Sequence, residues 1–103
     1  MAYKLIITKG AQNELERIAD YISESLCNPI AAIDFLEQVD KCYTTLSDSP
    51  LIYQVCDNIG MKYKEYRKVV INNYVLVYRV DIDANTVYVL HFFYGRRDYL
   101  NLI

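Results

Sequence analysis

The sequence has few residues of the types that build covalent or metal-stabilised folds: three cysteines, one histidine and no tryptophan among 103 residues. Cys27, Cys42 and Cys56 are odd in number, widely spaced and form no C-x-x-C pair, which argues against a disulfide framework and against a zinc site. We therefore expect three reduced thiols. Each is predicted to be a small buried or half-buried side chain.

Long hydrophobic runs are also missing. No segment approaches the ~18 consecutive apolar residues that a membrane-spanning helix needs. The apolar run Leu5-Ile6-Ile7 is not followed by a small-residue cleavage pattern, so we predict a cytoplasmic protein without a membrane partner. Low-complexity and repeated stretches are absent as well, and the length suits one hydrophobic core. We expect a single domain over residues 1–103.

The motifs of common enzyme classes are absent. The chain contains no G-x-x-x-x-G-K, G-x-G-x-x-G or H-E-x-x-H, and no Ser or Cys motif accompanies its one histidine, His91. His91 is therefore predicted to be structural, and neither a cofactor nor a metal is expected. The acidic residues of the first helix are better explained by a solvated surface than by acid–base catalysis.

Charge is distributed unevenly along the chain. The formal net charge is −2, but residues 1–60 carry four basic and nine acidic residues, whereas residues 61–103 carry seven basic and four acidic ones. The second half is thus positive, with basic clusters at 62–68 and at Arg96-Arg97. Such a cluster can meet a polyanion or an acidic protein partner, or it can be only a solvated face.

The first half of the sequence predicts a strand and two helices. Residues 3–8 are short, apolar and β-rich. A helical apolar stripe then covers roughly residues 9–26, and Asn28-Pro29 is a good start for a second helix that Ser47-Asp48-Ser49-Pro50 stops. Two helices joined by so short a link are expected to form an antiparallel hairpin. The two stripes consist of Leu15, Ile18, Ala19, Ile22 and Leu26, and of Ala32, Phe35, Leu36, Val39, Tyr43 and Leu46.

The second half predicts three strands after a surface loop at 50–64. The ranges 67–71, 74–81 and 86–94 are rich in Val, Ile and Tyr, and Asn72-Asn73 and Asp83-Ala84-Asn85 suit tight turns. The order is β-α-α-β-β-β, an α+β fold with the helical hairpin packed on a small, mostly antiparallel twisted sheet. The last two strands are apolar on both faces, so the helices should cover one face of the sheet. The site is expected on the uncovered or concave face.

One mixed set of side chains remains as a candidate site. Arginine offers a planar fork for phosphate or carboxylate, and tyrosine offers a ring for stacking, so together they suit single-stranded RNA. Packing is the alternative role for each tyrosine. The set consists of Arg67, Lys68, Arg79, Arg96 and Arg97, with Tyr66, Tyr78, Tyr94 and Tyr99.

Several segments in this order resemble the RelE/ParE superfamily of bacterial toxins. The helical hairpin, with residues 14–22 followed by Asn28-Pro29, resembles that of ParE-type toxins. The closing strands, ending in Gly95-Arg96-Arg97-Asp98, resemble the end of the family's sheet. The resemblance runs from Tyr3 to Tyr99.

The resemblance implies a type II toxin neutralised by a cognate antitoxin, and two targets. ParE-like members inhibit DNA gyrase, whereas RelE-like members cut messenger RNA on the ribosome. In the nuclease case Arg67 and Arg97 would be catalytic, without metal. Val69 and Val75 stand where the nuclease branch usually carries basic residues, and Tyr94 stands where ParE-like members often carry His. We therefore favour the gyrase inhibitor.

Three readings thus stand from sequence: a gyrase inhibitor, a ribosome-dependent endoribonuclease, and an inactive domain that binds only its antitoxin. A homodimer and a toxin–antitoxin hetero-oligomer are both open. In either toxin reading we expect the antitoxin to pair acidic residues with Arg67 or Arg97. Target or antitoxin contacts are predicted at Arg67, Lys68, Tyr94, Arg96, Arg97 and Tyr99.

Overall fold

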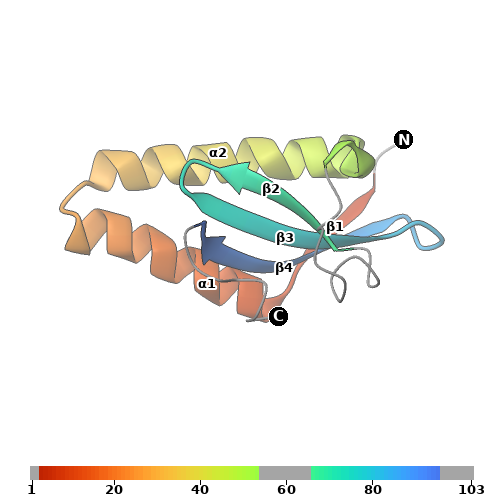
Figure 1. Cartoon of the computed structure of the whole chain (residues 1–103), viewed down its shortest axis with the longest axis horizontal. Helices are drawn as coiled ribbons and strands as arrows, with labels where there is room; N and C mark the ends of the chain where they lie inside the picture. The colour runs from red at the N-terminus through yellow and green to blue at the C-terminus, as the bar shows by residue number, and fades with distance from the viewer. Residues whose placement is uncertain (1–2, 54–65, 96–103) are drawn as a thin grey trace.

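The computed structural model describes residues 3–53 and 66–95. One strand precedes two helices, and three strands follow them (Figure 1). This order confirms the predicted β-α-α-β-β-β arrangement. The elements are β1 (Lys4–Ile7), α1 (Lys9–Asp20), the π-helix η1 (Tyr21–Ser25), α2 (Pro29–Asp48), the 3-10 helix η2 (Pro50–Ile52), β2 (Arg67–Ile71), β3 (Tyr74–Asp81) and β4 (Thr86–Tyr94).

Both helices begin at residues that cap them. The Thr8 side chain accepts a hydrogen bond from the Ala11 amide at 3.2 Å, and the Asn28 side chain accepts one from the Ala31 amide at 3.1 Å. Each bond satisfies an amide that has no partner inside its helix. The first helix does not stay α-helical to residue 26, because its end widens into the π-helix η1. Cys27, at a positive φ of 51°, then reverses the chain between the helices.

The sheet is mixed, with strand order β1-β4-β3-β2. β1 lies parallel to β4, while β3 is antiparallel to both β2 and β4. The predicted turns are present, and in each one an asparagine adopts a positive φ: 54° at Asn72 and 47° at Asn85. The β3–β4 register shifts at Val77/Tyr78, so that Leu90 is an extra residue in β4. Such a bulge twists and bends the strand that carries it.

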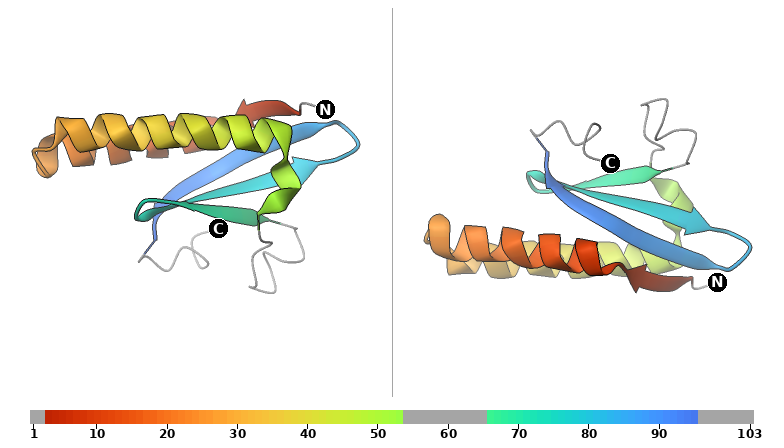
Figure 2. Two further views of the ribbon diagram at one scale, coloured as in Figure 1. Left: turned by 90° about the horizontal axis from the view of Figure 1, so that it is seen from above. Right: turned by 90° about the horizontal axis from the view of Figure 1, so that it is seen from below.

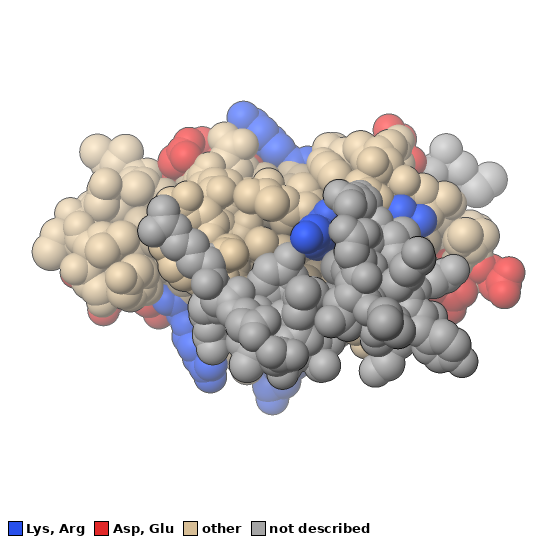
Figure 3. Space-filling model, in the orientation of Figure 1, with Lys and Arg blue, Asp and Glu red and all other residues tan. Residues whose placement is uncertain are grey.

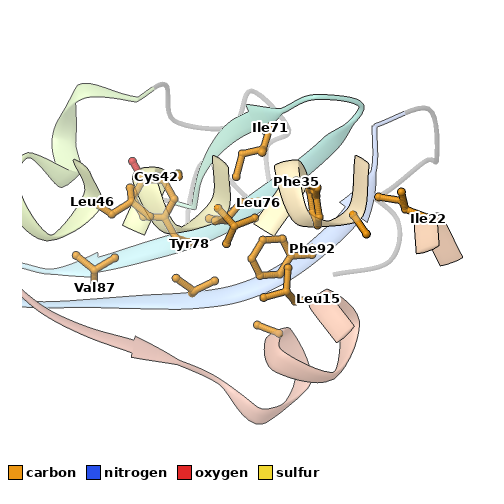
Figure 4. Close-up of a cluster of buried hydrophobic side chains, with 14 residues drawn as sticks. Leu15, Ile22, Phe35, Cys42, Leu46, Ile71, Leu76, Tyr78, Val87 and Phe92 are labelled. Carbon is orange, nitrogen blue, oxygen red and sulfur yellow. The ribbon is translucent and has the colours of Figure 1, made fainter. Parts of the chain in front are cut away.

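The main core lies between the helical hairpin and one face of the sheet. Phe35 and Leu46 from α2 and Leu76 and Tyr78 from β3 are fully buried there, and Figure 4 shows them pointing into one cluster. The neighbours that alternate with them on β3, Val75 and Val77, are buried too. Because successive side chains point to opposite faces, β3 is buried on both, as its sequence predicted.

The cysteine prediction holds for only one of the two cysteines described. Cys42 is buried in the core, and this burial raises the pKa of its thiol to about 11. Cys27 is exposed at the link between the helices, contrary to the expectation of a half-buried position. Cys56 lies outside the described residues. Among the residues that the structure describes, no helix is both long and apolar enough to cross a membrane.

The helix layer and the sheet form a wedge. Figure 2 shows the two layers close together at the β1 end and diverging toward the link between the helices. The same views show that link projecting past the end of the sheet.

Candidate partner-binding groove

A groove of about 530 Å³ occupies the open end of the wedge. This size is in the ordinary range for sites that bind a ligand or a peptide side chain. One wall comes from α1, η1 and the residue that follows η1, and the other comes from the end of β4 and the start of β3. The lining residues are Glu14, Arg17, Ile18, Tyr21, Leu26, Asn73, Tyr74, Phe92, Phe93 and Tyr94.

The groove exists because β1 is shorter than β4. β1 pairs only with Thr86–Val89, which we call the closed half of β4. The remaining residues, 90–94, have β3 on one side and no strand from the described residues on the other, and we call them the open half. The contacts with β1 and Thr8 end where the Thr8 amide donates to the Val89 carbonyl at 3.0 Å and the Thr8 hydroxyl to the Leu90 carbonyl at 3.3 Å. Beyond this point the edge of β4 faces the groove.

Half of the residues that line the groove are aromatic. The Tyr74 ring lies 5.1 Å from that of Phe35 and 5.7 Å from that of Tyr94, both in tilted arrangements that aromatic pairs favour. Burial, together with the nearby phenols of Tyr21 and Tyr94, raises the pKa of Tyr74 above its usual value. Tyr21 and Leu26 stay 52% and 54% exposed at the rim. The groove therefore offers a wide apolar surface to a partner.

Two charged side chains of α1 border this surface. The Glu14 carboxylate lies 3.1 Å from Nδ1 of His91, whose ring stacks on that of Phe93 at 5.1 Å. This arrangement supports the structural role that the sequence predicts for His91, since it holds α1 against β4. Arg17, one turn after Glu14, is exposed and forms no ion pair with any residue in 3–53 or 66–95. It is the cation that the groove presents.

Arg67, the first candidate from sequence, lies elsewhere and already has partners. Its guanidinium donates to the Tyr53 carbonyl at 2.7 Å and, more weakly, to the Leu51 carbonyl at 3.5 Å. Next to it, the buried Tyr78 hydroxyl donates to the Pro50 carbonyl at 2.6 Å. Both side chains thus fasten the segment after α2 to the sheet, and Tyr78 has the packing role that was the alternative to RNA stacking.

The predicted site residues are not all brought together. Arg67 pairs with Tyr78, whereas Tyr94 pairs with Tyr74, four residues away along β3 and so about 13 Å distant. Lys68 follows Arg67 on β2, half-buried. The Arg79 guanidinium lies over the Tyr88 ring at 5.5 Å. Arg79 follows Tyr78, so it lies toward the end of β3 that is away from Tyr74. Of the predicted contacts, only Tyr94 lines the groove, and Arg96, Arg97 and Tyr99 lie outside the described residues.

The described basic side chains do not gather in one patch on the face that Figure 3 shows. In the view of Figure 3 the lysines and arginines are scattered, with acidic residues between them. A polyanion site built from described residues would need them together. No group of three or more His, Cys, Asp or Glu that could hold a metal ion occurs within the parts of the chain that the structure describes.

Sequence reasoning selected only Tyr94 of the ten lining residues, and Glu14, Arg17, Tyr21 and Tyr74 are among those it missed. The two charged residues belong to an ordinary amphipathic helix, and nothing in the helical pattern marks them. The signal that was available is the unequal length of the first and last predicted strands, because a parallel partner that ends early leaves the longer strand with an open edge.

The fold is that of RelE/ParE-like toxins. The chain is similar to a chain of the chromosomal ParDE toxin–antitoxin system of Pseudomonas aeruginosa, with a TM-score of 0.71 and 15% identity, over 90% of this chain and 96% of that one. It is also similar to the RelBE2 toxin–antitoxin complex of Mycobacterium tuberculosis, with a TM-score of 0.64, 19% identity and coverage of 91% and 99%. For the intact Escherichia coli RelBE complex the corresponding values are 0.63, 20%, 93% and 100%.

The sequence itself assigns the branch. Residues 5–99 match the model of the ParE toxin of the type II toxin–antitoxin system parDE. The chain therefore belongs to the ParE toxin family. A comparison with the sequences of curated proteins finds no match.

Proposed function

We propose that this ParE-family toxin arrests growth in the cytoplasm by binding DNA gyrase, and that a cognate antitoxin neutralises it. Membership of the ParE family supports the target, and the toxin–antitoxin complexes among the structural relatives support the partner. In this proposal the toxin acts by contact and performs no chemistry of its own. Arg96, Arg97 and Tyr99, which lie outside the described residues, are proposed target or antitoxin contacts.

The observation that carries the choice of gyrase over RNA is the position of the Arg67 guanidinium. A metal-free nuclease needs charge around the scissile phosphate and a group that takes the proton of the 2′-hydroxyl. Arg67 instead donates to the Tyr53 carbonyl. The neighbouring strand positions are apolar, with Val69 half-buried and Val75 4% exposed, so they offer no second phosphate ligand.

A pulse-expression experiment tests the target. The wild type and Arg97→Ala are induced briefly in a bacterial host while DNA synthesis, protein synthesis and a reporter messenger RNA are followed. We expect DNA synthesis to stop first, with intact message and induction of the DNA-damage response. Purified gyrase should lose supercoiling activity when the wild-type chain is added.

The competing functions give different results in the same experiment. A ribonuclease stops translation first and cuts the message, and Arg97→Ala abolishes both effects. A domain that binds only its antitoxin stops neither synthesis. In the nuclease case Arg67 has two roles, as a positive charge near the phosphate and as a donor to the Tyr53 carbonyl. Arg67→Lys separates them, because lysine keeps the charge but loses the planar fork that reaches this carbonyl.

A further inference from the structure

We infer that the face of α2 that points away from the sheet is a docking surface for a basic, apolar helix of the toxin's target. The identity of the target rests on the proposed gyrase function, whereas the chemistry of the docked helix rests on the structure. Three features carry the inference: an exposed apolar row along α2, an acidic row beside it, and the open position of both rows in the fold.

The first feature is a row of apolar side chains that the core does not use. Ile30, Ile33 and Leu36 follow one another at intervals of three residues, so they are neighbours along one side of α2. They are 80%, 59% and 39% exposed. With 3.6 residues per helical turn, Ile30 and Ile33 lie on the side opposite the buried Phe35 and Leu46. Contiguous exposed apolar side chains of this kind mark interaction sites.

The second feature is an acidic row that runs beside the apolar one. Asp34, Glu37 and Asp40 each follow an apolar residue of the first row by four positions, so each lies next to it on the helix surface. All three are exposed, and none forms an ion pair with a residue in 3–53 or 66–95. Like charges one turn apart repel each other within a helix. Cations of a partner would offset this repulsion, so the two rows favour a surface that is both apolar and basic.

The third feature is the place of the two rows, which we call the outer ridge, in the fold. Figure 2 shows the sheet on one side of the helix layer and no described element on the other. The ridge starts beside the link between the helices, which projects past the end of the sheet. None of its residues lines the aromatic groove. A partner helix can therefore lie along the ridge without entering the groove between α1 and β4.

Charge decides among the possible occupants of the ridge. An enzyme that acts on DNA presents lysine and arginine to the phosphates, so gyrase carries basic surfaces that complement the acidic row. The antitoxin is a poorer occupant, because the basic second half of this chain favours acidic residues in it. A second copy of this chain is also a poorer occupant. A two-fold contact places a patch against itself, and it would set the acidic row of one copy against that of the other.

Binding of the purified full-length chain to purified gyrase, measured at low and at physiological salt, tests the apolar row. Ile33→Ser should weaken binding about tenfold, because it removes an apolar anchor from the middle of the row. Its matched control is Ile82→Ser, in the turn between β3 and β4, since Ile33 and Ile82 are both 59% exposed. The control should bind like the wild type.

A charge reversal in the same assay tests the acidic row. Asp40→Lys should weaken binding by at least about tenfold, and by more at low salt, because it places a cation against a basic partner. Asp83→Lys, the same change at an exposed position outside the ridge, is the matched control. Thermal unfolding shows whether each variant keeps the fold, and Ile30→Ser or Asp34→Lys replaces a variant that does not.

A peptide probe tests the chemistry of the ridge without gyrase. Acetyl-(Lys-Leu-Leu-Lys)3-amide, whose leucines recur at helical spacing between lysines, is added to the isotope-labelled chain. We expect backbone and methyl shifts concentrated at residues 30–40. The acidic counterpart acetyl-(Glu-Leu-Leu-Glu)3-amide should bind there at least about tenfold more weakly, because its charges oppose those of the ridge.

Five results overturn the inference. They are wild-type affinity of both ridge variants for gyrase, an equal loss in the two control variants, equal or tighter binding of the acidic peptide, shifts confined to residues outside the ridge, and a homodimer that Ile33→Ser dissociates. Absence of gyrase binding by the wild-type chain overturns the proposed function instead. The peptide comparison then decides alone whether the ridge accepts a basic helix.

Discussion

The closed and open halves of β4 are parts of one strand with different surroundings. In the closed half, Val87 and Val89 are fully buried and the backbone has strands on both sides. In the open half, Phe92 and Phe93 are also buried, but the backbone edge beside them has no strand neighbour within residues 3–53 and 66–95. Burial of side chains and pairing of backbone are therefore separate properties. A strand can contribute to the core and still present an edge to a partner.

The bulge at Leu90 marks the change between the two halves. The extra residue lies directly after the last residue that pairs with β1, and its carbonyl accepts the Thr8 hydroxyl that caps α1. The Thr8 side chain thus lies where the pairing of β1 ends and where the helix that forms the wall of the groove begins. This geometry explains why the helix layer and the sheet diverge from here on.

Hydrogen exchange gives the largest expected difference. In the free chain the amides of Val87 and Val89 should be protected because β1 pairs with this half of the strand, whereas those of Phe92 and Tyr94 should exchange at least about a hundredfold faster. Phe93 and Gly95, which point toward β3, are internal controls and should be protected. Uniform protection along β4 would show that the two halves do not differ in this way.

A pair of alanine substitutions compares the halves in stability. Val87→Ala removes a side chain that is 0% exposed and should lower the free energy of unfolding by about 2 to 3 kcal/mol. Tyr94→Ala removes a ring that is 37% exposed and should cost about 1 kcal/mol, mainly through its contact with Tyr74. Urea denaturation measures both. Equal losses would mean that the open half is as important for folding as the closed half.

The buried hydroxyl of Tyr78 tests a polar contact in the closed half. Tyr78 pairs with Val89, and its hydroxyl donates to the Pro50 carbonyl. Tyr78→Phe leaves that carbonyl without its partner and should lower stability by about 1 to 2 kcal/mol. Tyr88→Phe is the matched control, because this half-buried ring stacks under Arg79 and should lose less than about 0.5 kcal/mol. A loss as large at Tyr88 would remove the distinction.

The sequence was sufficient for the elements and insufficient for the site. Alternation and turn chemistry are local, and they placed β2, β3 and β4 at the bounds that the structure has. The groove is not local, because it depends on where β1 stops against β4 and on a bulge that no residue type in β4 announces. Arg67 was selected for its charge, and only the fold shows that its guanidinium is bound to carbonyl groups.

The smallest expected effect concerns a buried thiol, that of Cys42 on α2. Cys42 lies beside Leu46 and Tyr78 above the closed half, as Figure 4 shows, and burial raises the pKa of its thiol from 9.0 to about 11. Burial also raises the pKa of its neighbour Tyr43. Below pH 9 the thiol is protonated in both states and its contribution to stability is fully present. Between pH 9 and about 11 it ionises in the unfolded state first, so this contribution is lost as the pH rises through about 11.

The free energy of unfolding should therefore fall between pH 9 and about pH 11, and less steeply in Cys42→Ala than in the wild type. Tyr43 should keep part of the slope in both proteins. Cys27→Ala, which removes an exposed thiol far from this core, serves as the control and should follow the wild-type curve. Urea denaturation at successive pH values gives the slopes. Identical slopes for all three proteins would mean that the thiol above the closed half is as accessible to water as the one at the link between the helices.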